Sequence, residues 1–459
     1  MKKSVLTLLG MSVALFGASV TIPPKAKDIA ITIYNNNLAF VHEKRAVQVK
    51  KGMQKLVYEG VASQVITPSV VPEFSGAGVT LYSQNFRYNL IALGSLLKNS
   101  IGSKISFFTN GEQPQRLSGT LLSAAPVVVE SDKDGKLYAL NTPTQVIFPG
   151  IPSSMITRPS LVWRAEIDKD ATLGIDLKYL SRGIKWKSDY VLDLQEKVLD
   201  LRGWITITND SGATYENAQI SCIAGELHEA ARPVEYRNLK NMTAIPAPEA
   251  VHEESFSGYH LYKIPFRETV RDKEQKQMLF IDKKEIAYRQ YGKAVNSYFE
   301  NYGVQKLHFS NVITFINNQK NHAGIPFPAG VVRMYQKDST GEAHYIGEDR
   351  IANTPEDEEL KLTVGMLFDV TGEKRITRFV ADKYHRNVET TYEIRNRGKK
   401  ALDVKIEENI PTYGTKITLK SSCKNRCHEV KKSAFVREFT IALKPKETYR
   451  FTTEFEVVY

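Results

Sequence analysis

The sequence predicts an all-β protein made of several antiparallel, immunoglobulin-like sandwiches, with a small SH3-like barrel and one or two short helices. Three observations carry this prediction. Apolar and polar residues alternate with a period of two along most of the chain, as in half-buried strands. Short segments of Gly, Asn, Asp and Ser separate the runs and suit hairpins. One strand-and-turn unit recurs three times, which indicates repeated sandwiches.

The clearest alternation lies in residues 173–224, which predict four consecutive antiparallel strands. The first run places Leu173, Ile175, Leu177 and Tyr179 on one face. Cys222 lies on the apolar face of the last run, where it is expected to be a buried free thiol. We expect these strands to form one antiparallel sheet whose apolar face needs a second layer.

The first residues resemble a secretory signal peptide. Lys2 and Lys3 form a positive start, residues 5–16 are mostly apolar, and residues 17–19 are small. Such a segment is too short to span a membrane and is removed after export. With a signal peptide at 1–19 and no later apolar run of spanning length, we expect a soluble periplasmic, cell-surface or extracellular protein.

The composition is moderately basic. The 459 residues include 62 Lys and Arg against 51 Asp and Glu, a formal charge of +11. These charges are scattered, as on a solvated surface; attraction to an anionic envelope polymer or lipid surface is the sharper alternative. Export excludes nucleic acid as the natural partner, so the expected partners are an envelope protein or a surface polysaccharide.

Three regions precede or interrupt the main sheets. Residues 25–103 predict a small β domain with one helix, because leucines recur at helical spacing within 89–100. Residues 104–150 contain five short strands, at 104–109, 116–124, 127–130, 136–140 and 145–148, and predict the SH3-like barrel. Residues 225–258 are polar and aperiodic, which indicates either a disordered surface excursion or a binding loop.

The three recurring units each end a strand in asparagine. They are residues 205–209 (ITITN), 313–317 (ITFIN) and 392–396 (YEIRN). Asn209 and Asn396 suit turns that need a positive φ or local side-chain hydrogen bonds. Trp186 and Trp204, near the first unit, are expected to be core anchors rather than ligand platforms.

Several motifs occur in one order that resembles a known family. They are residues 179–190 (YLSRGIKWKSDY), 203–212 (GWITITNDSG), 215–218 (YENA), 223–226 (IAGE), 326–333 (PFPAGVVR), 345–349 (YIGED), 364–365 (VG), 368–370 (FDV) and 392–396. Together they resemble the secreted bacterial domain-of-unknown-function family grouped with mucoidy inhibitor A proteins. The resemblance covers about residues 155–459 and implies an all-β envelope domain with an upstream β domain and no established activity.

A tyrosine-rich segment is the candidate binding surface. Basic residues lie between the tyrosines of residues 283–302, and such a pattern can stack on sugars or pair with anionic polymers. The two faces of ordinary strands explain it as well, and we prefer that interpretation. The candidate residues are Tyr288, Arg289, Tyr291, Tyr298 and Tyr302.

Cys423 and Cys427 flank three residues and precede His428. In an exported protein, two cysteines this close predict a local disulfide that holds a loop. The run also resembles a haem-attachment motif, although it is one residue too long, and metal binding or a redox pair is a further alternative.

No catalytic, cofactor or metal motif is evident in the sequence, and the nine histidines show no metal-ligand spacing. We therefore expect a binding or scaffolding protein for a cell-envelope component rather than an enzyme. The alternative is a secreted hydrolase of glycans or peptides that uses acids and His252 of the long loop. A haem or thiol redox protein is the remote alternative.

Overall fold

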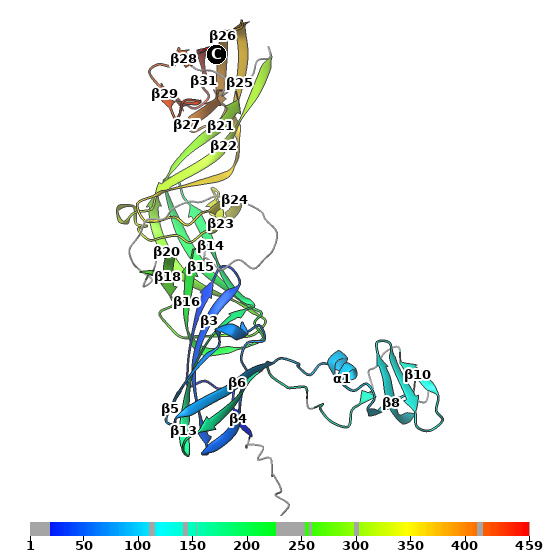
Figure 1. Cartoon of the computed structure of the whole chain (residues 1–459). Coiled ribbons are helices and arrows are strands. Elements are labelled where there is room, and N and C mark those ends of the chain that lie inside the picture. The colour runs from blue at the N-terminus through cyan, green and yellow to red at the C-terminus, as the bar shows by residue number, and fades with distance from the viewer. Residues whose placement is uncertain are drawn as a thin grey trace, which may run out of the picture. The chain divides into compact units, whose positions relative to one another are not determined.

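A computed structural model describes residues 19–109, 115–140, 146–152, 154–225, 253–256, 259–297, 303–410 and 416–458. Strands make up nearly all of the regular structure, which confirms the predicted all-β class (Figure 1). Contacts divide the chain into two compact units. The first comprises Met1–Lys185, Thr208–Cys222 and Phe266–Gln275, and the second comprises Trp186–Ile207, Ile223–Pro265 and Lys276–Tyr459.

Two sheets form the body of the first unit. One has the order β1 (Ser19–Ile22), β4 (Gly52–Glu59), β12 (Ser160–Ile167), β6 (Val79–Arg87). The part of the other sheet that belongs to this unit has the order β16 (Tyr215–Ala224), β2 (Asp28–Tyr34), β3 (Leu38–Val49), β13 (Ala171–Arg182), β5 (Val71–Ser75), with β19 (Glu268–Val270) beside β16. Trp163 of β12 is fully buried, and the Phe74 ring of β5 meets it edge-on at 5.8 Å. The contact with Phe74 thus links the two sheets, and the indole Nε1 donates to Gln84 of the neighbouring strand β6 at 2.7 Å.

A five-stranded sheet forms where the barrel was expected. Its order is β10 (Leu137–Leu140), β9 (Val127–Ser131), β8 (Arg116–Ala124), β7 (Lys104–Phe108), β11 (Val146–Ile147). All five strands lie within one residue or two of the predicted ranges. Helix α1 (Leu93–Asn99) lies inside the predicted helical segment, and its Leu97 joins the core of this sheet with Ile105 and Phe107.

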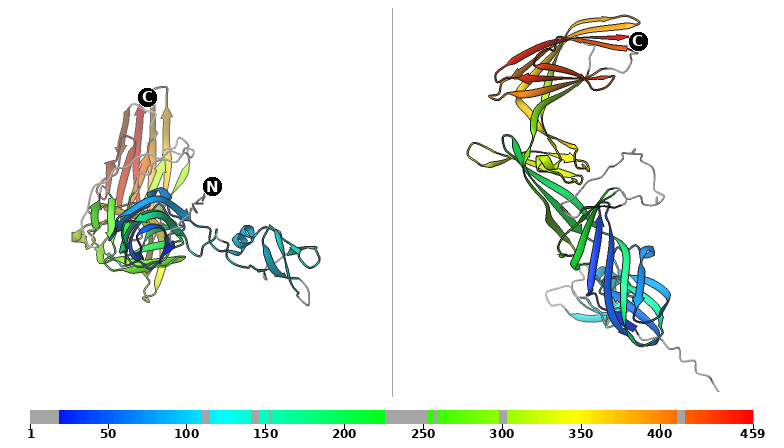
Figure 2. Two further views of the ribbon diagram at one scale, coloured as in Figure 1. Left: turned by 60° about the horizontal axis from the view of Figure 1, so that its bottom comes forward. Right: turned by 90° about the vertical axis from the view of Figure 1, so that its left-hand side faces the viewer.

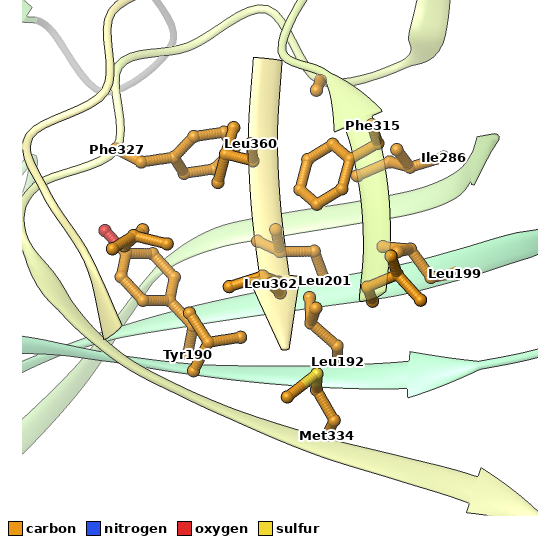
Figure 3. Packing of buried hydrophobic residues seen from close by; sticks show 14 of the residues in the cluster. Tyr190, Leu192, Leu199, Leu201, Ile286, Phe315, Phe327, Met334, Leu360 and Leu362 are labelled. Atoms are coloured by element: carbon orange, nitrogen blue, oxygen red, sulfur yellow. The ribbon is translucent and has the colours of Figure 1, made fainter. Parts of the chain in front are cut away.

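The second unit contains one five-stranded sheet and a larger one. The smaller sheet has the order β20 (Glu274–Ala287), β15 (Val198–Asn209), β14 (Ile184–Leu194), β23 (Gly330–Lys337), β24 (Ala343–Ile351). Its apolar face packs against the ends of β22 (Val304–Ile316) and β25 (Glu359–Ala381), where Phe315, Leu360 and Leu362 point towards Tyr190 and Leu192 (Figure 3). A hairpin of β17 (Glu253–Phe256) and β18 (Tyr259–Lys263) also belongs to this unit.

The larger sheet of the second unit has nine strands and curves so that its two edge strands approach each other. Its order is β28 (Lys416–Ser421), β31 (Thr448–Val458), β26 (His385–Asn396), β25, β22, β21 (Arg289–Ser297), β27 (Leu402–Asn409), β30 (Val436–Leu443), β29 (Cys427–Lys431). The two edge strands meet, because Ser421 of β28 hydrogen-bonds Glu429 of β29 at 2.9 Å. The sheet therefore encloses its own core, as the two layers of orange and red strands show (Figure 2).

Two short 3₁₀ turns, η1 (Thr67–Ser69) and η2 (Gln319–Asn321), complete the regular structure. No helix in the described part of the chain is both long and apolar enough to cross a membrane. The long loop predicted at 225–258 lies largely outside the described residues, as do residues 1–18 of the expected signal peptide.

The expected four-stranded sheet of residues 173–224 is wrong in its pairing, although all four strands exist and the first buries Leu173, Ile175, Leu177 and Tyr179. Only β14 and β15 are neighbours in a sheet, whereas β13 and β16 lie at different places in the β2–β3 sheet. A single residue, Gly183, separates β13 from β14, which is too short a join for a hairpin. At φ +85° this glycine bends the chain where a Cβ would lie 2.8 Å from the backbone of Ser211.

The recurring asparagine is confirmed as a structural repeat. Asn209, Asn317 and Asn396 are buried at the ends of β15, β22 and β26. Each amide nitrogen donates to the carbonyl of the first residue in a distant four-residue turn. These carbonyls belong to Arg271 (3.0 Å), Pro355 (2.8 Å) and Lys444 (3.1 Å).

The three distant turns are alike. Each has a positive φ at its third residue and glutamate at its fourth: Lys273 and Glu274, Asp357 and Glu358, Lys446 and Glu447. We call each asparagine with its turn an asparagine clasp. Local side-chain hydrogen bonds accompany the distant one, as from Asn209 to the Ala213 carbonyl and from Asn396 to the Lys400 carbonyl. None of the three asparagines has a positive φ.

Candidate functional site

A cavity of about 1090 Å³ lies in the first unit, beside β3 and β16, which Figure 1 labels. Its walls come from residues 24–29, Glu43, Arg45, Gly60, residues 158–159, Tyr179, residues 212–217, Arg267, Thr269 and Arg271. A cavity of this size is typical of a site for a ligand rather than for a single ion.

The floor of the cavity is a buried ion pair on β3. Glu43 and Arg45 are each 3% exposed, and Arg45 Nη2 donates to Glu43 Oε2 at 2.8 Å. Arg45 Nη1 donates to the carbonyls of Pro23 at 2.9 Å and Glu59 at 2.5 Å. Its guanidinium also lies 3.9 Å from the centre of the Tyr58 ring. These contacts hold the arginine in place, so its charge is a permanent feature of the floor.

Parts of this floor have no hydrogen-bond partner. Burial raises the pKa of Glu43, and the positive charge of Arg45 opposes that rise. Among the described residues, no group in good hydrogen-bond geometry reaches Glu43 Oε1 or Arg45 Nε, although both atoms are buried. The hydroxyl of Tyr58 interacts with the Glu43 carboxyl and lowers its pKa, but its geometry leaves both groups incompletely satisfied. Buried polar atoms in folded proteins nearly always find a partner, in the protein or in a bound molecule. A polar ligand in the cavity would supply one.

Two tyrosines complete the floor. Tyr179 and Tyr215 are almost fully buried, and burial raises the pKa of both phenols. They therefore stay neutral and able to donate a hydrogen bond at any physiological pH. The Tyr215 hydroxyl lies 3.1 Å from Ser211 Oγ, which anchors that ring.

The rim carries an excess of positive charge. The cavity walls contain six basic and three acidic residues. Arg267 is engaged: it donates to Asp28 at 2.5 Å and to the Asn217 carbonyl at 2.9 Å, and its hydrogen bond holds the pKa of Asp28 below the ordinary value. The side chains of Lys25, Lys27 and Arg158 are exposed and make no hydrogen bond or ion pair with any described residue. These three cations are available to an anionic ligand.

An asparagine clasp positions two walls of the cavity. Asn209 donates to the carbonyl of Ala213 at 2.8 Å and to that of Arg271 at 3.0 Å. Ala213 and Arg271 both line the cavity, so one amide sets the spacing between segments that are far apart in the sequence. Gly212, at φ +80°, lets the chain pass Ser63, whose Oγ would lie 2.3 Å from a Cβ there.

The tyrosine-rich segment has a different environment. Tyr291 is 7% exposed, and the ammonium of Lys405 lies 4.5 Å from its ring centre. Tyr288 is half-buried and donates its hydroxyl to the Gln195 carbonyl at 2.6 Å, whereas Arg289 is exposed. Tyr298 and Tyr302 lie outside the described residues. Of this candidate surface, the structure thus describes two tyrosines with partners inside the protein and one exposed arginine.

The cysteines lie away from the cavity-lining segments. Cys423, in the loop between β28 and β29, is joined by a disulfide with an S–S distance of 1.97 Å to Cys427, the first residue of β29. Cys222 is free and fully buried, as predicted, and burial raises the pKa of its thiol well above the usual range.

Trp186 is a core anchor as predicted, 3% exposed with Nε1 donating to the Ile223 carbonyl at 3.0 Å, whereas Trp204 is half-buried.

One group of side chains could approach a metal ion. Asp338, Glu342 and His344 place their ligand atoms within 4.8 Å of one another at an exposed turn. Asp338 already accepts hydrogen bonds from the hydroxyl and amide of Thr340 at 2.6 and 2.8 Å. Together with His344, these bonds hold its pKa far below the ordinary value. Asp338 therefore stabilises the turn through these hydrogen bonds, and they explain why the three side chains lie close together.

The family assignment follows from a comparison of the chain with protein families. Residues 175–459 match the family described as a domain of unknown function, DUF4139. The chain belongs to the DUF4139 family. No curated protein matches it. The DUF4139 region supplies Tyr179, residues 212–217 and Arg271 to the cavity, and it contains all three asparagine clasps. Arg267 and Thr269 of the lining also belong to that region, whereas residues 24–29, Glu43, Arg45, Gly60 and residues 158–159 precede it.

Inspection of the sequence missed the cavity, but a signal for its floor was present. β3 alternates buried and exposed positions, and Val41, Glu43 and Arg45 share the buried phase. Two charged residues at inward positions of a strand indicate a buried ion pair or a site. The unpaired cations of the rim carry no such signal, because exposed Lys and Arg are common on any surface.

Proposed function

We propose that this DUF4139 protein is an exported binding protein of the cell envelope, and that its cavity holds an anionic part of the ligand. The single observation that carries the proposal is the combination of Lys25, Lys27 and Arg158 without partners above a buried, incompletely satisfied Glu43–Arg45 floor. Export rests on the signal-like residues 1–19. The resemblance to proteins grouped with mucoidy inhibitor A also supports an envelope role.

An acidic surface polysaccharide suits this cavity best. Its carboxylates would pair with the rim cations, and its hydroxyls could reach Glu43 Oε1 and the tyrosine hydroxyls, which are neutral. A charged partner near a wall of low dielectric is attracted more strongly than one in open water. The cavity volume of about 1090 Å³ is also larger than one small anion needs.

Binding can be tested with oligogalacturonate as the probe, by calorimetry on the mature protein. The double variant Lys27→Gln/Arg158→Gln should raise Kd by about tenfold or more, because two charge-assisted contacts are lost. Lys55→Gln is the matched control, since Lys55 is exposed on β4 of the same unit and does not line the cavity. Its Kd should stay within about twofold.

Two results would contradict the proposal. Equal weakening by Lys55→Gln would mean that only the net charge of the surface matters. Equal affinity for a neutral oligosaccharide of the same length would remove the role of the cations. Export is tested separately: recovery of the full chain from the cytosol, with residues 1–19 still attached, would contradict it.

A secreted glycan hydrolase is the second candidate, because Glu43 combines a raised pKa with a place in a cavity. Carboxyls of this kind act as general acids in other enzymes. The bond from Arg45 to Glu43 Oε2 argues for a structural role instead. If the protein turns over a glycan, Glu43→Gln should abolish turnover while leaving binding; persistence of turnover in this variant would exclude Glu43 as the acid.

A further inference from the structure

A second buried polar cluster lies in the nine-stranded sheet and shares no residue with the lining of the cavity. Lys374 of β25, Glu408 of β27 and Asn296 of β21 all point into the enclosed core, with residue exposures of 3%, 0% and 4%. Above and below them the core is apolar: Tyr392, Phe439 and Phe451 on one side belong to one cluster, and Val388 and Phe455 belong to another. An amine, a carboxyl and a carboxamide thus meet in a dry interior.

The carboxyl group of Glu408 touches both of the other groups. Its Oε1 contacts the Lys374 ammonium directly, and its Oε2 accepts a hydrogen bond from Asn296 Nδ2 at 2.9 Å. Lys374 Nζ also donates to the carbonyl of Ser297, the residue after Asn296, at 3.4 Å. The amine is therefore held beside the Asn296–Ser297 segment. Asn296 and Glu408 face each other in the register of β21 and β27.

We propose that Lys374 and Asn296 become joined by an intramolecular amide bond, with Glu408 carrying the proton between them. The arrangement is that of an acyl transfer: a nucleophilic amine, an electrophilic carboxamide, and one carboxyl in contact with the nucleophile and the leaving group. Nothing else in the described part of the chain brings a lysine, a glutamate and an asparagine together in a core.

The step balances without any external reactant. The lone pair of Lys374 Nζ attacks Cγ of Asn296, and the C=O π pair moves onto Oδ1. Glu408 Oε1 accepts a proton from the attacking nitrogen, and the carboxyl group then passes one proton on to Nδ2. The Cγ–Nδ2 bond then breaks, the carbonyl re-forms, and ammonia leaves. One secondary amide and one ammonia replace one amine and one primary amide, and no group is oxidised or reduced.

The surroundings favour this reaction over hydrolysis. Burial lowers the pKa of Lys374 to about 7, so a substantial fraction of the amine is neutral and nucleophilic near neutral pH. The apolar residues around it exclude water, which would otherwise compete for the amide carbon. A static ion pair is the alternative, but it would keep two charges buried at a cost that their attraction often fails to offset.

The consequence is a covalent link inside the last sheet. In the sheet order, β22 lies between β21 and β25, so the bond would connect two strands that are not hydrogen-bonded neighbours. Such a link would keep the two strands joined even when denaturants unfold the chain. The proposal concerns the second unit alone and does not depend on the ligand of the cavity.

The test is the mass of the purified, reduced, full-length mature protein. The linked chain should be lighter by about 17 Da than its sequence mass, the mass of one ammonia. Digestion should yield one branched peptide that joins the segment of Asn296 to that of Lys374. Lys374→Met and Asn296→Ala should both show the full mass, and Glu408→Gln should show it as well, because an amide cannot relay the proton.

A matched control lies on the opposite face of the same strands. Lys293 of β21 and Glu407 of β27 form an ion pair at 2.8 Å, and both are partly exposed. Lys293→Met and Glu407→Gln should keep the mass deficit. The full sequence mass in folded wild-type protein, with separate unbranched peptides for Asn296 and Lys374, would overturn the proposal even if every variant failed to fold. A deficit that persists in folded Glu408→Gln would overturn the role of Glu408.

Discussion

At the scale of single residues, charge at an inward position of a strand is the feature that separates this protein from a simple sandwich. Glu43 and Arg45 stand where β3 would otherwise bury apolar side chains. Lys374 and Glu408 do the same in β25 and β27. Buried charges are costly unless they are paired, so each such residue depends on its partner more than a surface residue does.

Removal of one partner of the floor pair should be strongly destabilising. Arg45→Met leaves the Glu43 carboxyl buried without its cation and should lower the free energy of unfolding by about 3–5 kcal/mol in urea titration. Lys55→Met, on the exposed face of β4, should change it by about 0.5 kcal/mol or less. A loss in Arg45→Met no larger than that of the control would show that the pair is not buried as described.

The same variant should change how stability depends on pH. Without Arg45, burial raises the folded-state pKa of Glu43 with no opposing charge. The folded chain then binds a proton at a pH where the unfolded chain does not, so stability should rise as the pH falls towards the ordinary glutamate value. Unfolding of Arg45→Met and of the wild type at pH 5 and pH 8 tests this. If the variant loses the same amount of stability relative to the wild type at both pH values, the expectation is contradicted.

At the scale of elements, the asparagine clasp is the recurring connection. It joins a strand end to a turn 38 to 62 residues further along, as from Asn317 to Pro355 or from Asn209 to Arg271. In each case the amide group both donates and accepts, so a side chain of similar shape without the donor cannot replace it.

Asn396 gives the cleanest test of the clasp. Its Nδ2 donates to the carbonyls of Lys400 and Lys444, and its Oδ1 accepts from Gly398. Asn396→Ala should lower the free energy of unfolding by about 2–3 kcal/mol, because buried backbone groups lose their partners. Asn396→Asp should be at least as harmful, since a carboxylate would face two carbonyl oxygens. Asn311→Ala, which removes an exposed side-chain contact with Gln290, should cost about 1 kcal/mol or less. If Asn396→Asp were as stable as the wild type, the donor role of Nδ2 would be contradicted.

The third clasp turn also predicts acid sensitivity. Hydrogen bonds from Arg426 and from the Lys444 amide lower the pKa of Glu447 from 4.5 to about 2. Below pH 4.5 the unfolded chain takes up a proton that the folded chain does not, so this contribution to stability is lost as the pH falls from about 4.5 to about 2. In urea titrations across that pH range, Glu447→Gln should lose less stability than the wild type. If the free energy of unfolding fell with pH equally in both proteins, the role of Glu447 in acid sensitivity would be contradicted.

At the scale of the whole molecule, the family region and the compact units do not coincide. The DUF4139 match begins at residue 175, but β13 and β16 of that region sit in one sheet with β2 and β3 between them. A fragment of residues 175–459 lacks β2 and β3, so it should expose sheet edges and associate, whereas residues 19–459 should be monodisperse. Light scattering after gel filtration checks this. Hydrogen-exchange protection of residues 215–222 in a monomeric fragment would contradict it.

Local alternation determined much of this protein without help from the tertiary structure. It identified the all-β class, the five strands between residues 104 and 148, the buried face of Leu173 to Tyr179, and the thiol of Cys222 as buried. Each of these depends on side chains a few residues apart, and a period of two reports which face of a strand is apolar whatever the strand pairs with. The asparagine repeat was visible for the same reason.

Only the tertiary structure decided which strands are neighbours. β13 pairs with β3 over a separation of more than a hundred residues, from Leu38 opposite Arg182 to Val49 opposite Ala171. No local pattern specifies such a partner, because register depends on burial within the complete sheet. The cavity and the Lys374–Glu408–Asn296 cluster follow from those pairings, because each gathers side chains from strands that are distant in sequence. Their charged groups gain shifted pKa values and strong mutual interactions only when burial removes the water around them.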